Sequence, residues 1–373
     1  MYSHLLGITL RRSLILAATL LAVLPIAPIP AQAVQGGSDA TGDSRVVALV
    51  FGSNTRASCS GVPLSAYVVV AAGHCLSNPG YVYQSERYIP AGLSVSQPGV
   101  DLSKDIQSTR PKVLSVAVTP GYSDKSFADD IAFYFLSAPL SGFANIEISN
   151  LDELQSLKDN STAITHVGYG YILPGNIEDF KPHSITLKAS AISSIRFGYI
   201  VPPEKSTIST DESQGHALCK HDSGGPYLAT IGSVEKLAAI NLGADGCDRY
   251  GAGTSVTGTF GLNIYPYLDL LERNWKLFEA EHALLPNIQE ASQVIAAKIS
   301  RSRSAKVLVP TPSPSPSPSA SLQPTAIAAP SPAPTSSASG NNGSKTISCI
   351  KGKNIKMLSS ANPKCPKGYV LRK

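Results

Sequence analysis

Residues 219–226 read Cys-Lys-His-Asp-Ser-Gly-Gly-Pro, and this stretch decides how the rest of the chain is interpreted. It presents Ser223 on a glycine-rich turn, where backbone N–H groups can converge on one point. A serine hydroxyl becomes a useful nucleophile when an imidazole takes its proton, a carboxylate orients the imidazole and N–H groups hold the oxyanion. The stretch therefore predicts a nucleophilic serine and directs the search to a histidine and an acid elsewhere in the chain.

A histidine and an acid of this kind lie upstream. His74 follows the apolar run Val68–Gly73, so we expect it at the end of a buried strand. Asp130 directly precedes the apolar run Ile131–Leu136, which predicts a carboxylate at the start of another strand. Each residue alone has a structural explanation, as a core histidine, a turn aspartate or a tight glycine turn. Their occurrence together favours a catalytic site.

These three stretches resemble the motifs of the trypsin and chymotrypsin family of serine peptidases. The chain order His74, Asp130, Ser223 is that of this family and differs from the subtilisin and α/β-hydrolase orders. Further similarity runs through Val116–Tyr122 and Leu237–Cys247. The resemblance implies a serine endopeptidase that forms an acyl-enzyme and needs no cofactor.

The spacing of apolar residues agrees with a β fold. From Val34 to about Trp275, short apolar or alternating runs are separated by clusters of Gly, Pro, Asn, Asp and Ser, a pattern typical of an all-β barrel or sandwich. Helical spacing appears only late, over Leu268–Phe278 and again after Pro286. The resemblance implies two packed antiparallel β-barrels of the trypsin-like type, with the triad at their junction and a C-terminal helix.

The resemblance also gives each residue of the site a role. Ser223 would attack the scissile carbonyl, His74 would shuttle the proton and Asp130 would orient His74. Asp129 is the weaker candidate acid, because the family places its acid directly before the Ile-Ala pair. The N–H groups of His221 and Ser223 would form the oxyanion hole.

One position departs from the family pattern. The residue two before the nucleophile is glycine in the family and His221 here. If the turn requires a positive φ, histidine adopts it at some cost, and if histidine cannot, one oxyanion donor is misplaced. The loss of one such donor lowers turnover by about a hundred- to a thousandfold. The alternative function is therefore a catalytically silent trypsin-like fold that serves as a cell-surface binding protein.

The substrate pocket is predicted to be neutral. The family reads the substrate side chain with the residue six before the nucleophile, which is Ala217 here, followed by Leu218. The far wall of the pocket falls around Asn241 and Gly243. Because no acid stands at these positions, we expect small or apolar substrate side chains rather than basic ones.

The N-terminus has the features of a secretory signal peptide over residues 1–33. Two arginines precede the apolar run Leu14–Leu24, and a small-residue stretch ends at Ala33. The run is too short to cross a bilayer, so we expect a secreted protein with no transmembrane segment after signal removal. Cleavage after Ala33 exposes Val34, which resembles the activated terminus of the family, and its ammonium would pair with Asp222. The alternative is that Val34 is simply the first mature residue.

Six cysteines in an exported chain are free to form disulfides. A metal site is not expected, because ligands clustered as in C-x-x-C are absent from the sequence. Many connectivities are possible for six cysteines, and the sequence favours three local couples, which are Cys59 with Cys75, Cys219 with Cys247, and Cys349 with Cys365.

Composition divides the chain into segments. We expect a signal peptide over 1–33, a peptidase domain over 34–280, a helical extension over 281–308, a linker rich in Pro, Ser, Thr and Ala over 309–345, and a basic two-cysteine module over 346–373. A linker of this composition buries too little apolar surface to fold. A module of this size needs a staple such as a disulfide.

Charge is segregated along the chain. Of 31 lysines and arginines, twelve lie from Lys298 onward, whereas no Asp or Glu follows Glu290. Without the two leader arginines, Val34–Glu290 holds 17 basic residues against 26 acidic ones, a net charge of about −9. The basic module resembles a short two-cysteine segment at the ends of secreted actinobacterial proteins, and it suits contact with an anionic cell envelope or is a solvated tail. We expect a protein or peptide substrate and no nucleic-acid partner.

Overall fold

The fold is known from a computed structural model. It describes residues 37–76, 85–120, 122, 129–171, 180–193, 195–196, 199–200, 205–211, 218–244 and 259–305, and, nearer the C-terminus, 345–351, 354–360, 364–365, 367 and 370–371. The chain divides into two compact units, Met1–Val309 and Pro310–Lys373. Among the described residues, no helix is both long and apolar enough to span a membrane.

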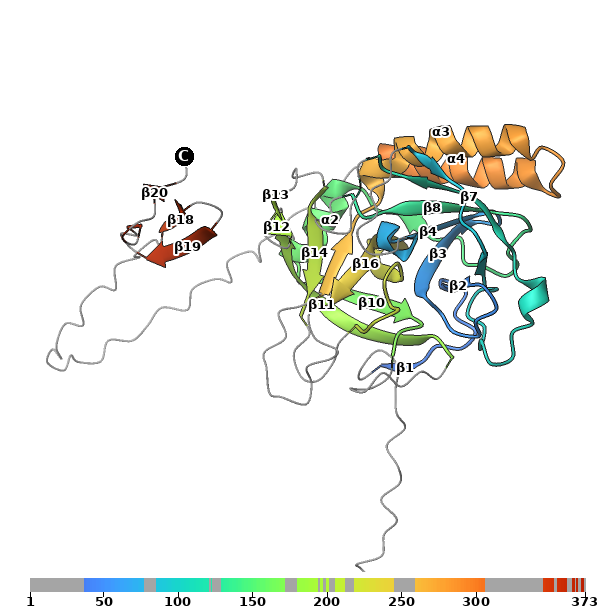
Figure 1. The fold of residues 1–373 in the computed structure, drawn as a ribbon, viewed down its shortest axis with the longest axis horizontal. Coiled ribbons are helices and arrows are strands. Elements are labelled where there is room, and N and C mark those ends of the chain that lie inside the picture. Colours follow the sequence, from blue (N-terminus) through green and yellow to red (C-terminus); the bar gives the residue numbers. More distant parts are fainter. Residues whose placement is uncertain are drawn as a thin grey trace, which may run out of the picture. The chain divides into compact units, whose positions relative to one another are not determined.

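Seven antiparallel strands form the first barrel (Figure 1). Their sequences are rich in β-branched and aromatic residues, and most of their side chains are fully buried. A bridge between Ser94 and Lys112 brings the last strand of the sheet back towards the region of β7. The order across the sheet is β5 (Arg87–Tyr88), β7 (Val113–Val118), β8 (Ala132–Leu136), β4 (Val68–Ala71), β3 (Cys59–Ser65), β2 (Val47–Phe51) and β6 (Leu93–Val95).

The second barrel is a larger sheet closed by the pairing of β11 (His183–Ser193) with β14 (Thr207–Thr210). A short strand, β9 (Glu147–Ile148), adds to it by parallel pairing with β16 (Val234–Ala244). A separate pair, β12 (Ile195–Arg196) and β13 (Tyr199–Ile200), stands outside the main sheet. The order across the main sheet is β1 (Ser38–Asp39), β11 (His183–Ser193), β10 (Ala163–Gly168), β15 (Pro226–Ile231), β16 (Val234–Ala244), β17 (Thr259–Leu262) and β14 (Thr207–Thr210). The two-barrel expectation is confirmed.

A helix between the barrels was not expected from the sequence. Helix α2 spans Leu151–Asp159 and begins with a capping box, in which the Asn150 side chain accepts from the Glu153 N–H and the Glu153 side chain accepts from the Asn150 N–H. Its buried leucines, Leu154 and Leu157, pack into the core of the second barrel. The helix is too short for its apolar spacing to be conspicuous, but the cap is visible in the sequence.

Two helices follow the barrels and lie side by side (Figure 1). Helix α3 (Leu268–Glu281) buries Phe278 against Phe135 of β8, with ring centroids 5.2 Å apart. Helix α4 (Ile288–Ser304) buries Lys298, whose ammonium donates to the Asn145 side chain at 2.6 Å and to a backbone carbonyl. The C-terminal helix expected on the barrels is therefore α3, and α4 packs beside it.

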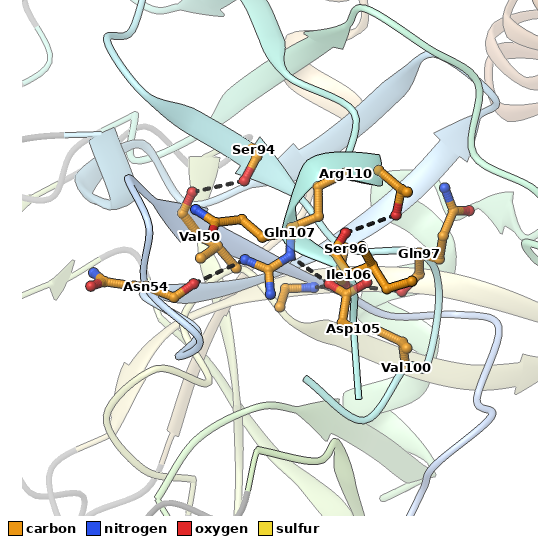
Figure 2. Close-up of polar contacts among 12 residues, drawn as sticks. Val50, Asn54, Ser94, Ser96, Gln97, Val100, Asp105, Ile106, Gln107 and Arg110 are labelled. Atoms are coloured by element: carbon orange, nitrogen blue, oxygen red, sulfur yellow. Dashed lines mark hydrogen bonds and ion pairs between the residues drawn. The ribbon is translucent and has the colours of Figure 1, made fainter. Parts of the chain in front are cut away.

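A buried ion pair anchors the loops at one end of the first barrel (Figure 2). The Arg110 guanidinium bonds Asp105 through Nε at 2.5 Å and the Asn54 carbonyl through Nη1 at 3.0 Å. The Gln107 side chain adds a bond to the Gly52 carbonyl at 3.0 Å. The β2–β3 loop is thereby held against the segment that precedes β7.

The C-terminal unit contains a small antiparallel sheet. Strand β18 (Lys345–Lys351) lies between β19 (Asn354–Ser360) and β20 (Val370–Leu371). The expected leader, residues 1–33, lies outside the described residues, as does the expected linker apart from Lys345.

Candidate active site

Strand pairing brings His74 and Asp130 together. His74 lies in the short helix η1 (Gly73–Leu76), directly after β4, and Asp130 lies just before β8. These two strands are neighbours, with Ala71 opposite Ala132. The turn after β4 therefore faces the turn before β8, although the two residues are 56 positions apart.

Two hydrogen bonds join the buried Asp130 carboxylate to His74. Oδ2 lies 2.8 Å from the imidazole Nδ1, and Oδ1 accepts from the His74 backbone N–H at 2.8 Å. Asp130 is fully buried, whereas His74 is partly exposed. With its proton on Nδ1, the imidazole keeps Nε2 as an acceptor, which is the form a general base needs. Gly73 allows this approach, because a Cβ there would stand 3.2 Å from Asp130 Oδ1.

The turn that carries Ser223 is tightly wound. The Asp222 N–H donates to the Cys219 carbonyl at 3.1 Å, and the Gly225 N–H donates to the Asp222 carbonyl at 2.9 Å. Gly224 has a φ of 83°, and a Cβ there would overlap a carbonyl of β3. A side chain at Gly224 would therefore displace the turn that carries Ser223.

Strands of both barrels hold this turn. On the first barrel, the Ser60 N–H donates to the Ser223 carbonyl and the Ser60 hydroxyl donates to the His221 carbonyl, both at 2.9 Å. On the second, the Gly224 N–H donates to the Asn241 carbonyl at 2.6 Å. Cys75, the neighbour of His74, lies with its sulfur 3.8 Å from the Ser223 carbonyl. The junction of the barrels thus gathers all three expected residues.

Two N–H groups of the turn are unused. Within the described residues, neither the His221 N–H nor the Ser223 N–H donates a hydrogen bond, whereas those of Asp222, Gly224 and Gly225 all do. Unused donors on either side of one residue are suited to a developing oxyanion.

His221 adopts the backbone conformation that the sequence left open, with a φ of 79°. Its ring packs on the Tyr171 ring with centroids 4.6 Å apart, and the Lys220 ammonium lies 5.9 Å from the centroid of the same tyrosine ring. Burial, followed by the charges of Lys220 and Arg56, lowers the pKa of His221 to about 4. The imidazole is therefore neutral at pH 7.

Asp222 is a buried carboxylate beneath the turn. It accepts from the Cys219 N–H at 2.7 Å and the Gly170 N–H at 2.8 Å, and a Cβ at Gly168 or Gly170 would overlap it. Burial raises the pKa of Asp222 to about 7. Val34, the expected source of an ammonium partner, lies outside the described residues.

The expected pocket residues have different surroundings. Leu218 is buried in the core of the second barrel. Asn241 is also buried, and its Oδ1 faces the Tyr227 hydroxyl at 3.3 Å and the Gly243 N–H at 3.2 Å. Gly243 is partly exposed, with open space where a Cβ would stand. Ala217 lies outside the described residues.

Among the described residues, four of the expected cysteines are disulfide-bonded. Cys59 is bonded to Cys75, and Cys219 and Cys365 each form a disulfide. Cys247 and the side chain of Cys349 lie outside the described part of the structure. The ligand atoms of Cys59, His74 and Cys75 lie within 4.8 Å of one another, but the disulfide removes both thiolates that a metal would require.

Comparison with known proteins gives one family. A family model described as Trypsin matches residues 34–260. Trypsin delta and trypsin gamma of Drosophila erecta are each 27% identical over 178 residues, and trypsin alpha of Drosophila melanogaster is 25% identical over 178 residues. These alignments cover 46% of this chain and 63–64% of the relatives, so the chain spans less than two thirds of their length.

Proposed function

This chain belongs to the trypsin family, and from that premise we propose that it is a secreted serine endopeptidase acting through Ser223, His74 and Asp130. The observation that supports the proposal best is the Asp130–His74 hydrogen bond of 2.8 Å beside a turn with two unused N–H groups. A base, its orienting acid and an oxyanion site are the parts that acyl transfer to serine requires.

In the acylation step, the Ser223 hydroxyl oxygen attacks the peptide carbonyl while His74 Nε2 takes the hydroxyl proton. Asp130 stabilises the imidazolium that forms, because its carboxylate is buried and already bonded to Nδ1. The tetrahedral oxyanion accepts from the N–H groups of His221 and Ser223. Collapse breaks the peptide C–N bond as His74 returns the proton to the leaving amine.

Deacylation repeats these steps with water as the nucleophile. His74 takes a proton from the water as its oxygen attacks the acyl carbonyl, and then returns it to Ser223 as the ester bond breaks. His221 supplies only its backbone N–H to these steps, and its neutral ring adds no charge that would compete with protonation of His74. No cofactor is required.

We propose a preference for small or apolar substrate side chains on the acyl side. Support comes from Ala217 and Leu218, since neither offers the acid that would attract a basic side chain. The open space beside Gly243 is compatible with a side chain entering there.

Activation would follow from signal removal. Cleavage after Ala33 would free the Val34 ammonium, and its insertion beside Asp222 would neutralise a buried carboxylate that otherwise accepts from only two backbone N–H groups in the described structure. The C-terminal module would hold the enzyme near an anionic cell envelope through its lysines and arginines.

A second function, a silent trypsin-like fold used for binding, is suggested by one feature alone, which is His221 at the position where the family has glycine. Against it, His221 adopts the positive φ that a glycine would supply, and both N–H groups of the turn are unused within the described residues.

A fluorophosphonate probe separates the two functions. We would label the mature protein and compare it with Ser223→Ala and His221→Gly. Labelling that disappears only in Ser223→Ala supports the endopeptidase. If the native chain does not label but His221→Gly does, the endopeptidase proposal fails and the binding protein replaces it.

A further inference from the structure

Basic side chains gather on one side of the nucleophile turn. Lys220 and His221 come three and two residues before Ser223, respectively, and Arg56 lies in the β2–β3 loop, three residues before the disulfide-bonded Cys59. Lys220 and Arg56 are both exposed. Within the described residues, Lys220 forms no ion pair.

Backbone and ring contacts hold the segments that carry these side chains. The Tyr171 N–H donates to the Lys220 carbonyl at 3.1 Å, and the Tyr171 ring contacts the His221 ring while facing the Lys220 ammonium. The β2–β3 loop that carries Arg56 is tied down two residues earlier, where Arg110 bonds the Asn54 carbonyl (Figure 2).

Backbone hydrogen bonds show which side of the Ser223 turn faces the first barrel. The carbonyls of His221 and Ser223 both accept from Ser60, so this side of the turn faces β3. The Tyr169 N–H also donates to the Ser60 hydroxyl, at 2.9 Å, which brings the Tyr171 segment to the same strand. The opposite side of the turn is bonded to Asn241 of β16.

In the proposed mechanism, the leaving group of the substrate lies on the side of the turn that faces β3. His74 must protonate the departing amine, so that amine lies on the His74 side of Ser223. The neighbour of His74, Cys75, is bonded to Cys59, the first residue of β3. The leaving segment of a substrate would therefore run over the disulfide and towards Arg56 and Lys220.

Two positive charges act on His221 within the described part of the chain. They are those of Lys220 and Arg56, and after burial they are the causes that lower the pKa of the His221 imidazole. The nearest carboxylate in sequence, Asp222, is buried and bonded to backbone N–H groups beneath the turn. A neutral imidazole near two cations offers hydrogen bonding without opposing their charge.

We propose that Lys220, Arg56 and His221 form a subsite for an acidic side chain in the leaving segment, within the first residues after the scissile bond. This inference rests on the proposed endopeptidase function and deepens it, since it concerns the part of the substrate that the acyl-side pocket does not read. The ligand group is a carboxylate, held by two cations and the imidazole.

Matched peptides test the subsite. Internally quenched peptides would share one acyl-side sequence, with a small apolar residue at the bond, and carry Asp, Asn or Lys in the first two leaving positions. We expect kcat/KM to be about two- to fivefold higher for Asp than for Asn at each position, because partly exposed ion pairs are weak. Lys should be poorer than Asn, and 0.5 M salt should remove the differences.

Charge reversal assigns the preference to these residues. Lys220→Glu and Arg56→Glu should each abolish or invert the ratio of Asp to Lys peptides. The matched control is Lys188→Glu, an equal charge change at an exposed position of β11, which should leave the ratio unchanged.

The experiments distinguish failure of the subsite proposal from failure of the endopeptidase proposal. If Ser223 labels with the probe and the peptides are cleaved without regard to charge in the leaving segment, the subsite is wrong and the endopeptidase stands. A preference that persists in both charge-reversed variants, or changes equally in Lys188→Glu, also overturns it. If no Ser223-dependent cleavage occurs, both proposals fail.

Discussion

His221 combines a backbone role with an unfavourable conformation. Its φ of 79° costs a side-chain-bearing residue about 1 kcal/mol that glycine does not incur. We expect His221→Gly to label at Ser223 within about threefold of the native rate, because the proposed oxyanion donor is a backbone N–H that glycine also has. We expect His221→Ala, which keeps a Cβ but loses the ring contact with Tyr171, to unfold more easily than His221→Gly by about 1 kcal/mol.

Urea denaturation of both variants measures this difference, and probe labelling of each checks that the turn is intact. Equal stability of the alanine and glycine variants would mean that the positive φ carries no cost at this position. A labelling rate in His221→Gly that falls a hundredfold, about the cost of losing one oxyanion donor, would mean that the imidazole itself takes part.

The raised pKa of Asp222 predicts a pH dependence of stability that tests the proposed insertion of the Val34 ammonium. Burial raises the pKa of Asp222 from the ordinary value of 3.8 to about 7 in the fold, so between about pH 4 and pH 7 the folded protein binds more protons than the unfolded chain. The free energy of unfolding should therefore fall as pH rises through this window, by about 1.4 kcal/mol for each pKa unit at most. A Val34 ammonium beside Asp222 would lower this pKa and flatten the profile.

The comparison is between protein that starts at Val34 and protein with one extra alanine before it, each denatured at several pH values. The extended form should lose stability between pH 4 and pH 7, and the form that starts at Val34 should not. Asp222→Asn in the extended form is the control and should remove the slope. Identical profiles for the two N-termini would contradict the insertion of Val34.

The site residues that could be predicted from the sequence are those that lie in a local motif. His74, Asp130 and Ser223 each lie in such a motif, and the replacement of glycine by His221 is visible within one of them. Ser60 was missed because nothing near it in sequence signals its role, and its bond to the His221 carbonyl spans 161 positions.

Among the structural elements, the turn that enters β8 depends on a contact from the C-terminal part of the domain. Asp129, at a φ of 56°, accepts from the Tyr267 hydroxyl at 2.9 Å and pairs with Lys205 at 2.6 Å, directly before Asp130. We expect Tyr267→Phe to lower the free energy of unfolding by about 0.5–1.5 kcal/mol, the usual net worth of a hydrogen bond. It should also lower kcat severalfold with little change in KM, because the orienting carboxylate is held less firmly.

Tyr265→Phe is the matched control. Within the described part of the chain, the Tyr265 hydroxyl forms no hydrogen bond, so its removal should leave both kcat and stability nearly unchanged. Equal effects of the two substitutions would show that the Asp129 contact does not support the site.

Strands were easier to predict than helix α2. Runs such as Val47–Phe51 and Ala132–Leu136 are apolar throughout, as buried strands require. Helix α2 has only nine residues, so its apolar positions make no long periodic pattern. Its capping pair, Asn150 and Glu153, was the available signal.

For the whole molecule, closure of the barrels depends on pairings that no local pattern specifies. The second barrel is closed by β11 and β14, and the first by a bridge between Ser94 and Lys112. Apolar spacing alone left a barrel and a sandwich equally open, since each buries alternate faces of short strands. The expectation of two barrels came from the resemblance of the motifs, and the family match over residues 34–260 supports it.

The segregation of charge along the chain predicts that the C-terminal unit attaches the protein to anionic surfaces. Beyond residue 308 lie eight lysines and arginines and no acid, whereas Val34–Glu290 carries a net charge of about −9. An anionic surface should therefore repel the peptidase body and attract the tail. We expect the full chain to bind vesicles that contain anionic phospholipid at 50 mM salt and to release them at 0.5 M, because counterions screen such contacts.

A chain ending at residue 308 should not bind these vesicles, yet should cleave a short neutral peptide at the full-length rate, since every residue assigned to the site lies before Ala244. Replacing Lys351, Lys353, Lys356 and Lys364 by Gln in the full chain should weaken binding in the same direction without removing the unit. Sedimentation with vesicles of zero, 20% and 40% anionic lipid would measure the dependence on surface charge. Binding that survives 0.5 M salt, or that the shortened chain retains, would show that contacts other than charge attach the protein.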